Sequence, residues 1–446
     1  MFPGREKTRK KQSFDQFLRN RQSIKVFEKG EYGEVFTPLE IIDEMLASLP
    51  KSVWNNPDLR WLDPACGIGN FPLKIIHGGS GYPGLLEGLA PLMPDLPSRK
   101  KHILSMLHCY DINEHNIAVF RKVMRNFSSG EHNVFLGDFL EASVDGLFDV
   151  IVGNPPYNSG GTKRVGEKRL HVRFTERSLS LLRADGFLLF VCPPNYRQAG
   201  STMNHLFRDR VGHFQYIRIL GPEETHKLFK VQTRVDIFLF CLRHGLKTHI
   251  VDEYGFSHTV RLDLSKHVPN FGHSIFEKMR SQPAAAVTAF RSAEATTITC
   301  DGFQKRGGYP TVHLIIEEGR KILSRRTKHT LQNVPKLIIN GLGVPYAFYD
   351  LSGVYGVTQT PLVVTNPSSE LVQFTQSKLF YFLVWALRLT GNNNLSYIFD
   401  DVPADFGHGL KLNRGEQELV ESFSVPAYAD LDIPIVCGGT RKIAKA

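Results

Sequence analysis

Short apolar runs alternate with helical patterns over residues 60–242 of the 446-residue chain. Each run spans four to eight residues, which is the usual length of a β-strand. Helical patterns separate the runs, as at Asn113–Met124 and Leu170–Arg183. This alternation predicts an α/β domain in which helices cover both faces of a mostly parallel, Rossmann-like sheet. The predicted strands are Arg60–Asp63, Met106–Asp111, Asn133–Leu136, Asp149–Gly153, Gly186–Cys192, Tyr216–Leu220 and Val235–Leu242.

Two regions depart from the alternation. Residues 78–99 are rich in glycine and proline, which predicts a long insertion or a surface excursion. After about Gly245, short strands mix with isolated helices such as Ser369–Thr390, which predicts a less regular, mixed α+β domain. We therefore expect an N-terminal arm at residues 1–30, the α/β domain at 31–245 and a C-terminal domain at 246–446.

The net charge of +10 is distributed unevenly. Residues 1–30 contain nine Lys and Arg against three acids, so this arm carries more than half of the excess. A basic arm attracts a nucleic-acid backbone in a salt-dependent, sequence-independent way. A solvated tail accounts for the same charge equally well, and a nuclear-localisation role for Lys7–Lys11 has weaker support.

Composition excludes several classes of protein. The longest apolar stretch, Leu379–Leu387, is too short to span a bilayer, and the charged N-terminus is not a secretory signal. The cysteines at 66, 109, 192, 241, 300 and 437 stand singly, and the histidines form no HExxH pattern. We therefore expect free thiols, no metal and no membrane contact, in a protein that works inside a cell.

The strongest chemical signal is a strand that ends in a stiff turn, Asp149-Val-Ile-Val-Gly-Asn154-Pro155-Pro156-Tyr157. The prolines fix the backbone and leave carbonyl oxygens without competing N–H groups. The Asn154 side-chain oxygen and the Pro155 carbonyl are then placed to accept both hydrogens of one exocyclic amine. Such contacts favour a pyramidal nitrogen with its lone pair turned toward an electrophile, while Tyr157 stacks on the base. A Pro-Pro turn is also common as a turn with no chemical function.

A second signal is the segment Trp61-Leu62-Asp63-Pro64-Ala65-Cys66-Gly67-Ile68-Gly69-Asn70-Phe71, in which a strand enters a Gly-x-Gly turn and then a helix. The glycines allow a close backbone approach to a ligand, and the helix N-terminus favours a carboxylate. This arrangement suits the methionine end of S-adenosylmethionine. The third glycine of the dinucleotide fingerprint and the Gly-Lys-Ser/Thr of a P-loop are both missing.

Two further acids follow strands. Asp111, in Cys109-Tyr110-Asp111-Ile112-Asn113, is placed to hold ribose hydroxyls, as in nucleotide-binding sheets generally. Asp138, in Leu136-Gly137-Asp138-Phe139-Leu140, is placed to accept from an adenine amine while Phe139 packs on the ring. Either acid taken alone is more often an ordinary surface residue.

The order of these segments, preceded by Glu31-Tyr32-Gly33-Glu34-Val35-Phe36-Thr37-Pro38, resembles the N6-adenine DNA methyltransferases of restriction–modification systems. It is similar to their gamma arrangement, in which cofactor motifs precede the catalytic motif and a target-recognition domain follows. The resemblance is detailed over residues 30–242. It implies a Rossmann-like methyltransferase fold and S-adenosyl-L-methionine as cofactor. It assigns cofactor contacts to Phe36, Thr37, Pro38, Asp63, Ala65, Gly67, Gly69, Asp111, Ile112, Asp138 and Phe139, and catalysis to Asn154, Pro155, Pro156 and Tyr157.

The same resemblance offers an aromatic residue that stacks on a flipped target base. Leu228–Val235 is similar to that segment of the family, which makes Phe229 the candidate beside Tyr157. A packed core phenylalanine explains Phe229 nearly as well. Ile68 and the pair Cys109-Tyr110 depart from the family pattern without touching the catalytic turn.

These features predict an enzyme that binds double-stranded DNA between two domains, flips out one adenine and methylates it in line. The C-terminal domain is expected to read base edges, with Lys305, Arg306, Arg325, Arg326 and Asn392–Asn394 as candidates. We expect a monomer that is cytoplasmic and DNA-associated. A cognate restriction endonuclease is a conceivable partner, whereas the thirty or so residues before the Phe36 segment are too few for a fused nuclease.

Three alternatives stay open at this point. A methyltransferase acting on a release-factor glutamine or an rRNA base uses a related Asn-Pro-Pro turn. N4-cytosine methylation poses the same amine chemistry, although those enzymes usually have serine in place of Asn154. A non-catalytic DNA-binding relative is the third, and the intact Asn154–Tyr157 turn and both glycines argue against it.

Overall fold

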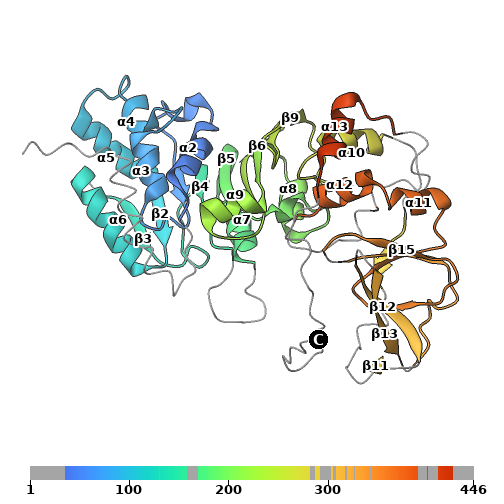
Figure 1. The fold of residues 1–446 in the computed structure, drawn as a ribbon. Helices are drawn as coiled ribbons and strands as arrows, with labels where there is room; N and C mark the ends of the chain where they lie inside the picture. The colour runs from blue at the N-terminus through green and yellow to red at the C-terminus, as the bar shows by residue number, and fades with distance from the viewer. Residues whose placement is uncertain are drawn as a thin grey trace, which may run out of the picture. The chain divides into compact units, whose positions relative to one another are not determined.

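The computed structural model describes residues 36–129, 131–157, 169–281, 287–291, 303–304, 308–316, 319–325, 327–341, 343–389, 399 and 410–424. Two compact units divide the chain, Met1–Lys266 and His267–Ala446 (Figure 1). The basic arm lies outside the described residues, as do Lys305, Arg306, Arg326 and Asn392–Asn394. None of the helices in the described ranges is long and apolar enough to cross a membrane.

The first unit is built on one nine-stranded sheet with the order β3-β2-β1-β4-β5-β7-β6-β8-β9. Strands β1 to β5 run parallel, and the antiparallel β7 lies between β5 and β6. The strands are β1 (Trp61–Asp63), β2 (Leu107–Asp111), β3 (Asn133–Leu136), β4 (Phe148–Gly153), β5 (Leu182–Cys192), β6 (His213–Leu220), β7 (Val235–Cys241), β8 (Thr248–Val251) and β9 (Ser257–Val260).

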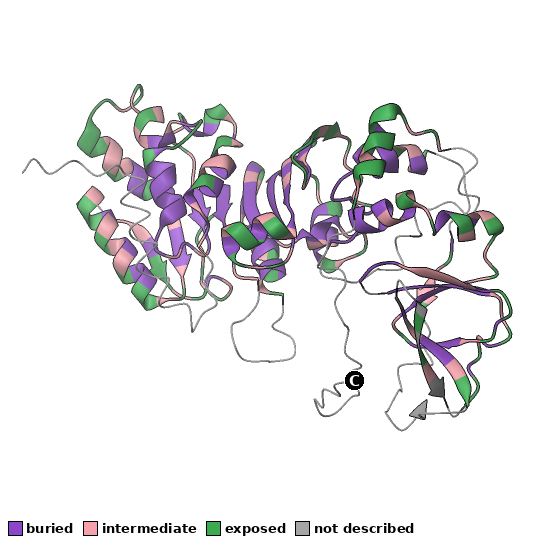
Figure 2. Cartoon of the chain, viewed as in Figure 1, coloured by how far each residue is buried: buried purple, intermediate pink, exposed green. Residues whose placement is uncertain are grey.

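Helices in this unit connect the strands as the sequence predicts for an α/β domain. They are α2 (Leu39–Ala47), η2 (Lys51–Val53), α3 (Asn70–His77), α4 (Gly84–Gly88), α5 (Leu96–Met106), α6 (Glu114–Phe127), α7 (Leu170–Ser180), η3 (Pro194–Arg197), α8 (Thr202–Arg208) and α9 (Pro222–Phe229). Asn113 caps the N-terminus of α6, since its side chain accepts the His115 N–H over 3.0 Å. All seven residues of β7 are buried, which requires cover on both faces of the sheet. The predicted fold class is therefore confirmed (Figure 2).

Two expectations for this unit need correction. The Gly/Pro-rich region 78–99 is no mere surface excursion, because Leu85 in α4 and Leu89 directly after it are fully buried in the core. The boundary expected at residue 245 falls within the sheet, and the units divide after Lys266 instead. The reason is that β8 pairs with β6 and β9 with β8, so residues 248–260 continue the first sheet.

The second unit contains two four-stranded sheets and four helices in its described ranges. One sheet has the order β10-β17-β14-β15 and the other β11-β13-β12-β16. The strands are β10 (Phe290–Arg291), β11 (Phe303–Gln304), β12 (Tyr309–Ile316), β13 (Gly319–Arg325), β14 (Lys336–Ile339), β15 (Ala347–Asp350), β16 (Gly356–Val357) and β17 (Leu362–Thr365). The helices are α10 (His273–Arg280), α11 (Ser369–Phe374), α12 (Lys378–Ala386) and α13 (Arg414–Ser422).

Strand β14 shows how the layers of this unit form. Its side chains alternate between two cores, as the pleat of a strand requires. Leu337 and Ile339 belong to the core made with the helices, whereas Ile338 belongs to the core shared with β12 and β16. The single helix predicted at Ser369–Thr390 is wrong: the hydroxyl of Ser377 caps a new helix, α12, by accepting the Phe380 N–H.

Candidate active site

The predicted motifs meet at one edge of the nine-stranded sheet. Because β1, β2, β3 and β4 are parallel, the residues after their carboxyl ends lie along a common edge. The glycine turn follows β1, Asp111 ends β2, Gly137 and Asp138 follow β3, and Asn154 follows β4. The sheet thus brings together segments that are far apart in the sequence.

The two glycines after β1 are required for different reasons. Gly67 has a left-handed φ of 54°, and a Cβ there would come no nearer than 3.8 Å to another residue, the Phe36 ring. Gly69 has a φ of 89°, and a Cβ there would lie 2.2 Å from the ring of Phe120 in α6. Gly67 therefore leaves open space at the turn, whereas Gly69 allows the turn to pack on α6.

Hydrogen bonds join the glycine turn to the end of β2. The Cys66 N–H donates to the Tyr110 carbonyl over 2.9 Å, and the Gly67 N–H donates to Asp111 Oδ2 over 2.8 Å. The other oxygen of Asp111 accepts the Asn113 N–H over 2.8 Å. These bonds fix the turn relative to the acid that the sequence predicts as a ribose ligand.

Asp63, at the end of β1, is a buried acid with one oxygen in use. Its side chain is 3% exposed, and Oδ1 accepts the Ala65 N–H over 3.1 Å. Oδ2 is buried and has no hydrogen-bond partner among the described residues. Burial raises the pKa of Asp63 well above its ordinary value, with the bond from Ala65 opposing and Asp111 adding to the shift. A cationic ligand group at Oδ2 would compensate this burial.

The remaining predicted cofactor residues differ in exposure. Ile112 is 60% exposed immediately after Asp111, and Asp138 is exposed while its Oδ1 accepts the Leu140 N–H over 2.9 Å. The Gly137 N–H donates to the Asp111 carbonyl over 3.0 Å, which draws this segment to β2. Phe139 is only 2% exposed and packs against Tyr110 and Phe174, so its ring is already covered.

The Asn154 turn touches the cofactor segments directly. Gly153 ends β4, and a Cβ at that position would lie 2.9 Å from Asp63 Oδ1. Asn154 is half-buried, and its Nδ2 donates to Thr37 Oγ1 over 3.1 Å. Thr37 is 5% exposed and precedes Pro38, the N-cap residue of α2. The Phe36–Pro38 segment therefore adjoins both the glycine turn and the predicted catalytic turn.

Pro155, Pro156 and Tyr157 complete the turn. Pro155 is buried, whereas Pro156 and Tyr157 are half-buried. Burial, followed by the nearby Cys192 and Asp236, raises the pKa of the Tyr157 phenol well above its ordinary value. The phenol is thus neutral, and it presents an uncharged ring at the site.

His171, at the start of α7, contacts Tyr157, and sequence reasoning did not predict this contact. Its ring meets that of Tyr157 edge to face at 6.2 Å, and its Nδ1 lies 3.2 Å from the Tyr157 carbonyl. Since a carbonyl only accepts, Nδ1 carries the proton in this contact. Burial lowers the pKa of His171, which favours the neutral ring.

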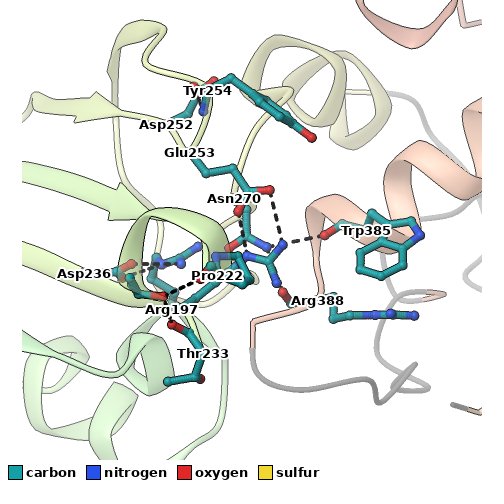
Figure 3. A network of polar contacts seen from close by, with 12 residues as sticks. Arg197, Pro222, Thr233, Asp236, Asp252, Glu253, Tyr254, Asn270, Trp385 and Arg388 are labelled. Carbon is teal, nitrogen blue, oxygen red and sulfur yellow. Dashed lines mark hydrogen bonds and ion pairs between the residues drawn. The ribbon is translucent and has the colours of Figure 1, made fainter. Parts of the chain in front are cut away.

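A buried ion pair beside the turn was also missed. Arg197 and Asp236 are both fully buried, with Nε–Oδ2 and Nη2–Oδ1 distances of 2.7 and 3.1 Å (Figure 3). Asp236 is one of the groups that raise the pKa of Tyr157. The single acid in the apolar run Val235–Cys241 was the available signal, but its partner could not be identified from spacing.

Phe229, the second candidate for stacking, ends α9 and is 4% exposed within the core of the first unit. Its ring has no open face in this conformation, so stacking on a base would require the ring to be uncovered. The role stays a prediction. No group of three His, Cys, Asp or Glu side chains within the described ranges could hold a metal ion.

Parts of the chain are similar to known proteins. Residues 100–222 match the family model described as Eco57I restriction-modification methylase. An uncharacterized adenine-specific methylase of Mycoplasma pneumoniae is 34% identical over 107 residues, which are 23% of this chain and 24% of that protein. The type II methyltransferase M.PaeR7I of Pseudomonas aeruginosa is 27% identical over 225 residues, or 44% of this chain and 38% of that protein. The crystal structure of the EcoKI M protein, from a type I restriction enzyme, has 16% identity and a TM-score of 0.38, covering 49% and 48% of the two chains.

The sheet order and the two turns at its edge define a Rossmann-like methyltransferase fold. The predicted resemblance to the adenine methyltransferases of restriction–modification systems is confirmed by the family match and by these relatives. The matched stretches cover only 24% and 38% of the two relatives' own lengths.

Proposed function

We propose that the chain transfers a methyl group from S-adenosyl-L-methionine to the N6 amino group of an adenine in double-stranded DNA. One observation carries the proposal: the Asn154 turn lies directly against the predicted cofactor segments, because Asn154 donates to Thr37 and Gly153 packs so near Asp63 that a Cβ there would not fit. A methyl donor held by those segments would lie next to the acceptor group of the turn. The family match and the adenine-specific relative support adenine as the substrate.

The residues present fit the cofactor. The buried Oδ2 of Asp63, which has no described partner, suits a ligand ammonium group, as methionine carries. Exposed Ile112 offers an apolar surface for an adenine ring beside Asp111, and exposed Asp138 offers an acceptor for its amine. When bound, S-adenosyl-L-methionine supplies a methyl group already activated by a positive sulfur. The protein's own task is therefore positioning.

Asn154 and Pro155 carry out that positioning at the acceptor amine. The Asn154 Oδ1 and the Pro155 carbonyl accept the two amine hydrogens, which turns the nitrogen lone pair toward the donor. Charge that develops on the nitrogen is then stabilised by oriented oxygens without a covalent intermediate. The neutral ring of Tyr157 stacks on the base.

Access to the amine requires base flipping, because the amine is paired inside a duplex. Extrusion costs a few kcal/mol, which stacking on Tyr157 and backbone contacts offset. We further propose that the second unit reads bases and that the basic arm at 1–30 contacts phosphates. The same proposal includes a monomeric enzyme and, as its partner, a cognate restriction endonuclease.

The test compares acceptors side by side. The full chain with tritiated S-adenosyl-L-methionine is offered plasmid DNA from a host without adenine methylation, a release factor, and unmodified rRNA, and the DNA product is identified by nucleoside mass spectrometry. We expect N6-methyladenine in the plasmid alone. Label in the release factor or rRNA, or N4-methylcytosine in the plasmid, would refute the assignment.

Asn154→Ala is the matched variant for this test. It should lower transfer at least about 100-fold, as loss of a catalytic oxygen ligand does, while calorimetric cofactor binding persists. Near-normal turnover would remove Asn154 from the mechanism.

A further inference from the structure

The turn between β8 and β9, residues 252–256, exposes two aromatic side chains. Tyr254 is 50% exposed and Phe256 is 57% exposed. Both belong to a five-residue connection within the first unit, and the proposed chemistry uses neither. Single exposed apolar residues are ordinary on a protein surface. Two exposed rings on one short turn, however, form a small apolar surface.

Asp252 holds this turn in shape. Its side chain is 2% exposed, and its Oδ1 accepts the N–H groups of both aromatic residues, from Tyr254 over 3.0 Å and from Phe256 over 2.9 Å. His258 Nε2 lies 2.9 Å from the other oxygen. A buried acid thus fixes the backbone at the two positions whose rings are exposed.

The neighbouring acid ties the turn to the rest of the sheet. Glu253 forms an ion pair with Arg234, with Nε–Oε2 at 2.6 Å and with side chains only 8% and 4% exposed. In Figure 3 the Glu253 side chain points into this network, whereas the Tyr254 ring points away from it. Burying charge is costly unless it is paired. Two consecutive acids, each held by a partner, therefore fix the backbone of the turn that carries the two exposed rings.

The strand register places this turn at the edge that carries the site. One row of paired residues crosses five strands, Gly153–Phe190–Phe238–Ile217–Ile250. Asn154 follows the first residue of this row directly, and Asp252 comes two residues after the last. Four strand spacings, or about 19 Å, separate the turn after β4 from the turn after β8. That distance corresponds to about five or six base pairs along a duplex.

We propose that Tyr254 and Phe256 form a second contact with the duplex that presents the target adenine, packing on sugars and base faces beside the flipped position. This inference rests on the proposed function, because the occupant is the DNA that the Asn154 turn would modify. Aromatic rings suit such a partner, since every base has a stacking face. The charge of Glu253 is offset by its ion pair with Arg234, which lowers the repulsion of phosphates at this turn.

Cations at the same edge support this choice of partner. Lys227, in the last turn of α9, and Lys230, directly after that helix, are both exposed. Strand β7 then begins at Val235, which pairs with Leu220, the last residue of β6. Lys230 lies between the aromatic turn and the Asn154 turn in strand order. Phosphate contacts with Lys227 and Lys230 would hold a duplex across the aromatic turn and the Asn154 turn.

The experiment uses the full chain and a double variant, Tyr254→Ala with Phe256→Ala. Leu246→Ser is the matched control, because Leu246 is 71% exposed and precedes β8, at the opposite edge of the sheet. The probe is a duplex of about 40 base pairs centred on an adenine mapped as methylated in plasmid DNA. Duplex affinity is measured by fluorescence anisotropy, cofactor affinity by calorimetry, and position by hydroxyl-radical footprinting.

We expect the double variant to bind the duplex at least about tenfold more weakly, since aromatic stacking contributes that much per base. Footprint protection should disappear about five or six base pairs from the methylated adenine, while cofactor affinity and thermal unfolding stay unchanged. Wild type and double variant should bind alike to a duplex cut about four base pairs from the adenine on that side.

Equal duplex affinity of wild type and double variant would overturn the inference. A double variant that loses cofactor affinity or thermal stability together with duplex affinity would overturn it as well. Failure of the proposed function gives a different result: wild type itself would methylate no plasmid adenine. In that case a random-sequence duplex of about 40 base pairs still measures whether the turn contacts DNA at all.

Discussion

The side-chain amide of Asn154 donates from Nδ2 to the hydroxyl oxygen of Thr37 over 3.1 Å, although 117 residues separate them in the chain. An asparagine amide has one donor end and one acceptor end. When Thr37 takes the donor end, the Oδ1 end is left for the amine of the substrate. The segment predicted to close over the cofactor therefore also orients the predicted catalytic oxygen.

Replacing Thr37 tests this coupling. Thr37→Val removes the hydroxyl at nearly constant volume, so we expect kcat for methyl transfer to fall about fivefold to tenfold, the equivalent of one neutral hydrogen bond. Thr37→Ser keeps the hydroxyl and should retain most of the activity. Steady-state kinetics with calorimetric cofactor binding separates the roles. A loss confined to cofactor affinity would show that Thr37 serves the cofactor alone.

The two glycines of the cofactor turn should respond differently to alanine. Gly69→Ala forces a methyl group into the Phe120 ring at a left-handed position, so we expect a loss of about 2–5 kcal/mol in the free energy of unfolding. Gly67→Ala meets open space and should cost about 1–2 kcal/mol from backbone strain alone. Urea unfolding of both variants measures the difference. Equal losses would contradict the packing argument.

The sequence predicted the parts of the site that are encoded locally. The strand ends, the glycine turn and the Asn154–Tyr157 turn are contiguous segments whose residue types constrain the backbone by themselves. Parallel pairing then brings them to one edge, as the α/β alternation indicates. Asp63 and Asp111 consequently end β1 and β2, and Asn154 follows β4, whereas their roles toward a cofactor and a base stay predictions.

The features that were missed depend on pairings over long distances. Strands β8 and β9 have little apolar alternation of their own and are fixed by pairing with β6, so the boundary at residue 245 was placed too early. The bonds of His171 to Tyr157 and of Arg197 to Asp236 join separate elements and leave no spacing signal. Phe139 and Phe229 are aromatic in sequence but covered in the fold, because burial is decided by neighbouring elements.

The Arg197–Asp236 pair yields a prediction about stability. Asp236→Leu removes the carboxylate that pairs with the fully buried Arg197 guanidinium, so we expect the free energy of unfolding to fall by about 3–5 kcal/mol. Adding Arg197→Met removes the buried guanidinium charge as well and should restore most of that loss. Urea unfolding of the single and double variants measures the coupling. Additive losses in the double variant would mean that the two charges do not depend on each other.

His171 predicts how stability depends on pH. Burial lowers the pKa of its imidazole in the folded protein below the ordinary value of 6.5, so the unfolded chain binds a proton at a higher pH than the folded one does. Stability from this group is therefore complete above about pH 6.5 and is lost as the pH falls from there toward the folded pKa. His171→Gln keeps a donor for the Tyr157 carbonyl but does not titrate. Urea unfolding of both proteins at a series of pH values should show wild type losing stability relative to the variant below about pH 6.5. Parallel pH profiles for the two proteins would mean that His171 has the same pKa in the folded and unfolded states.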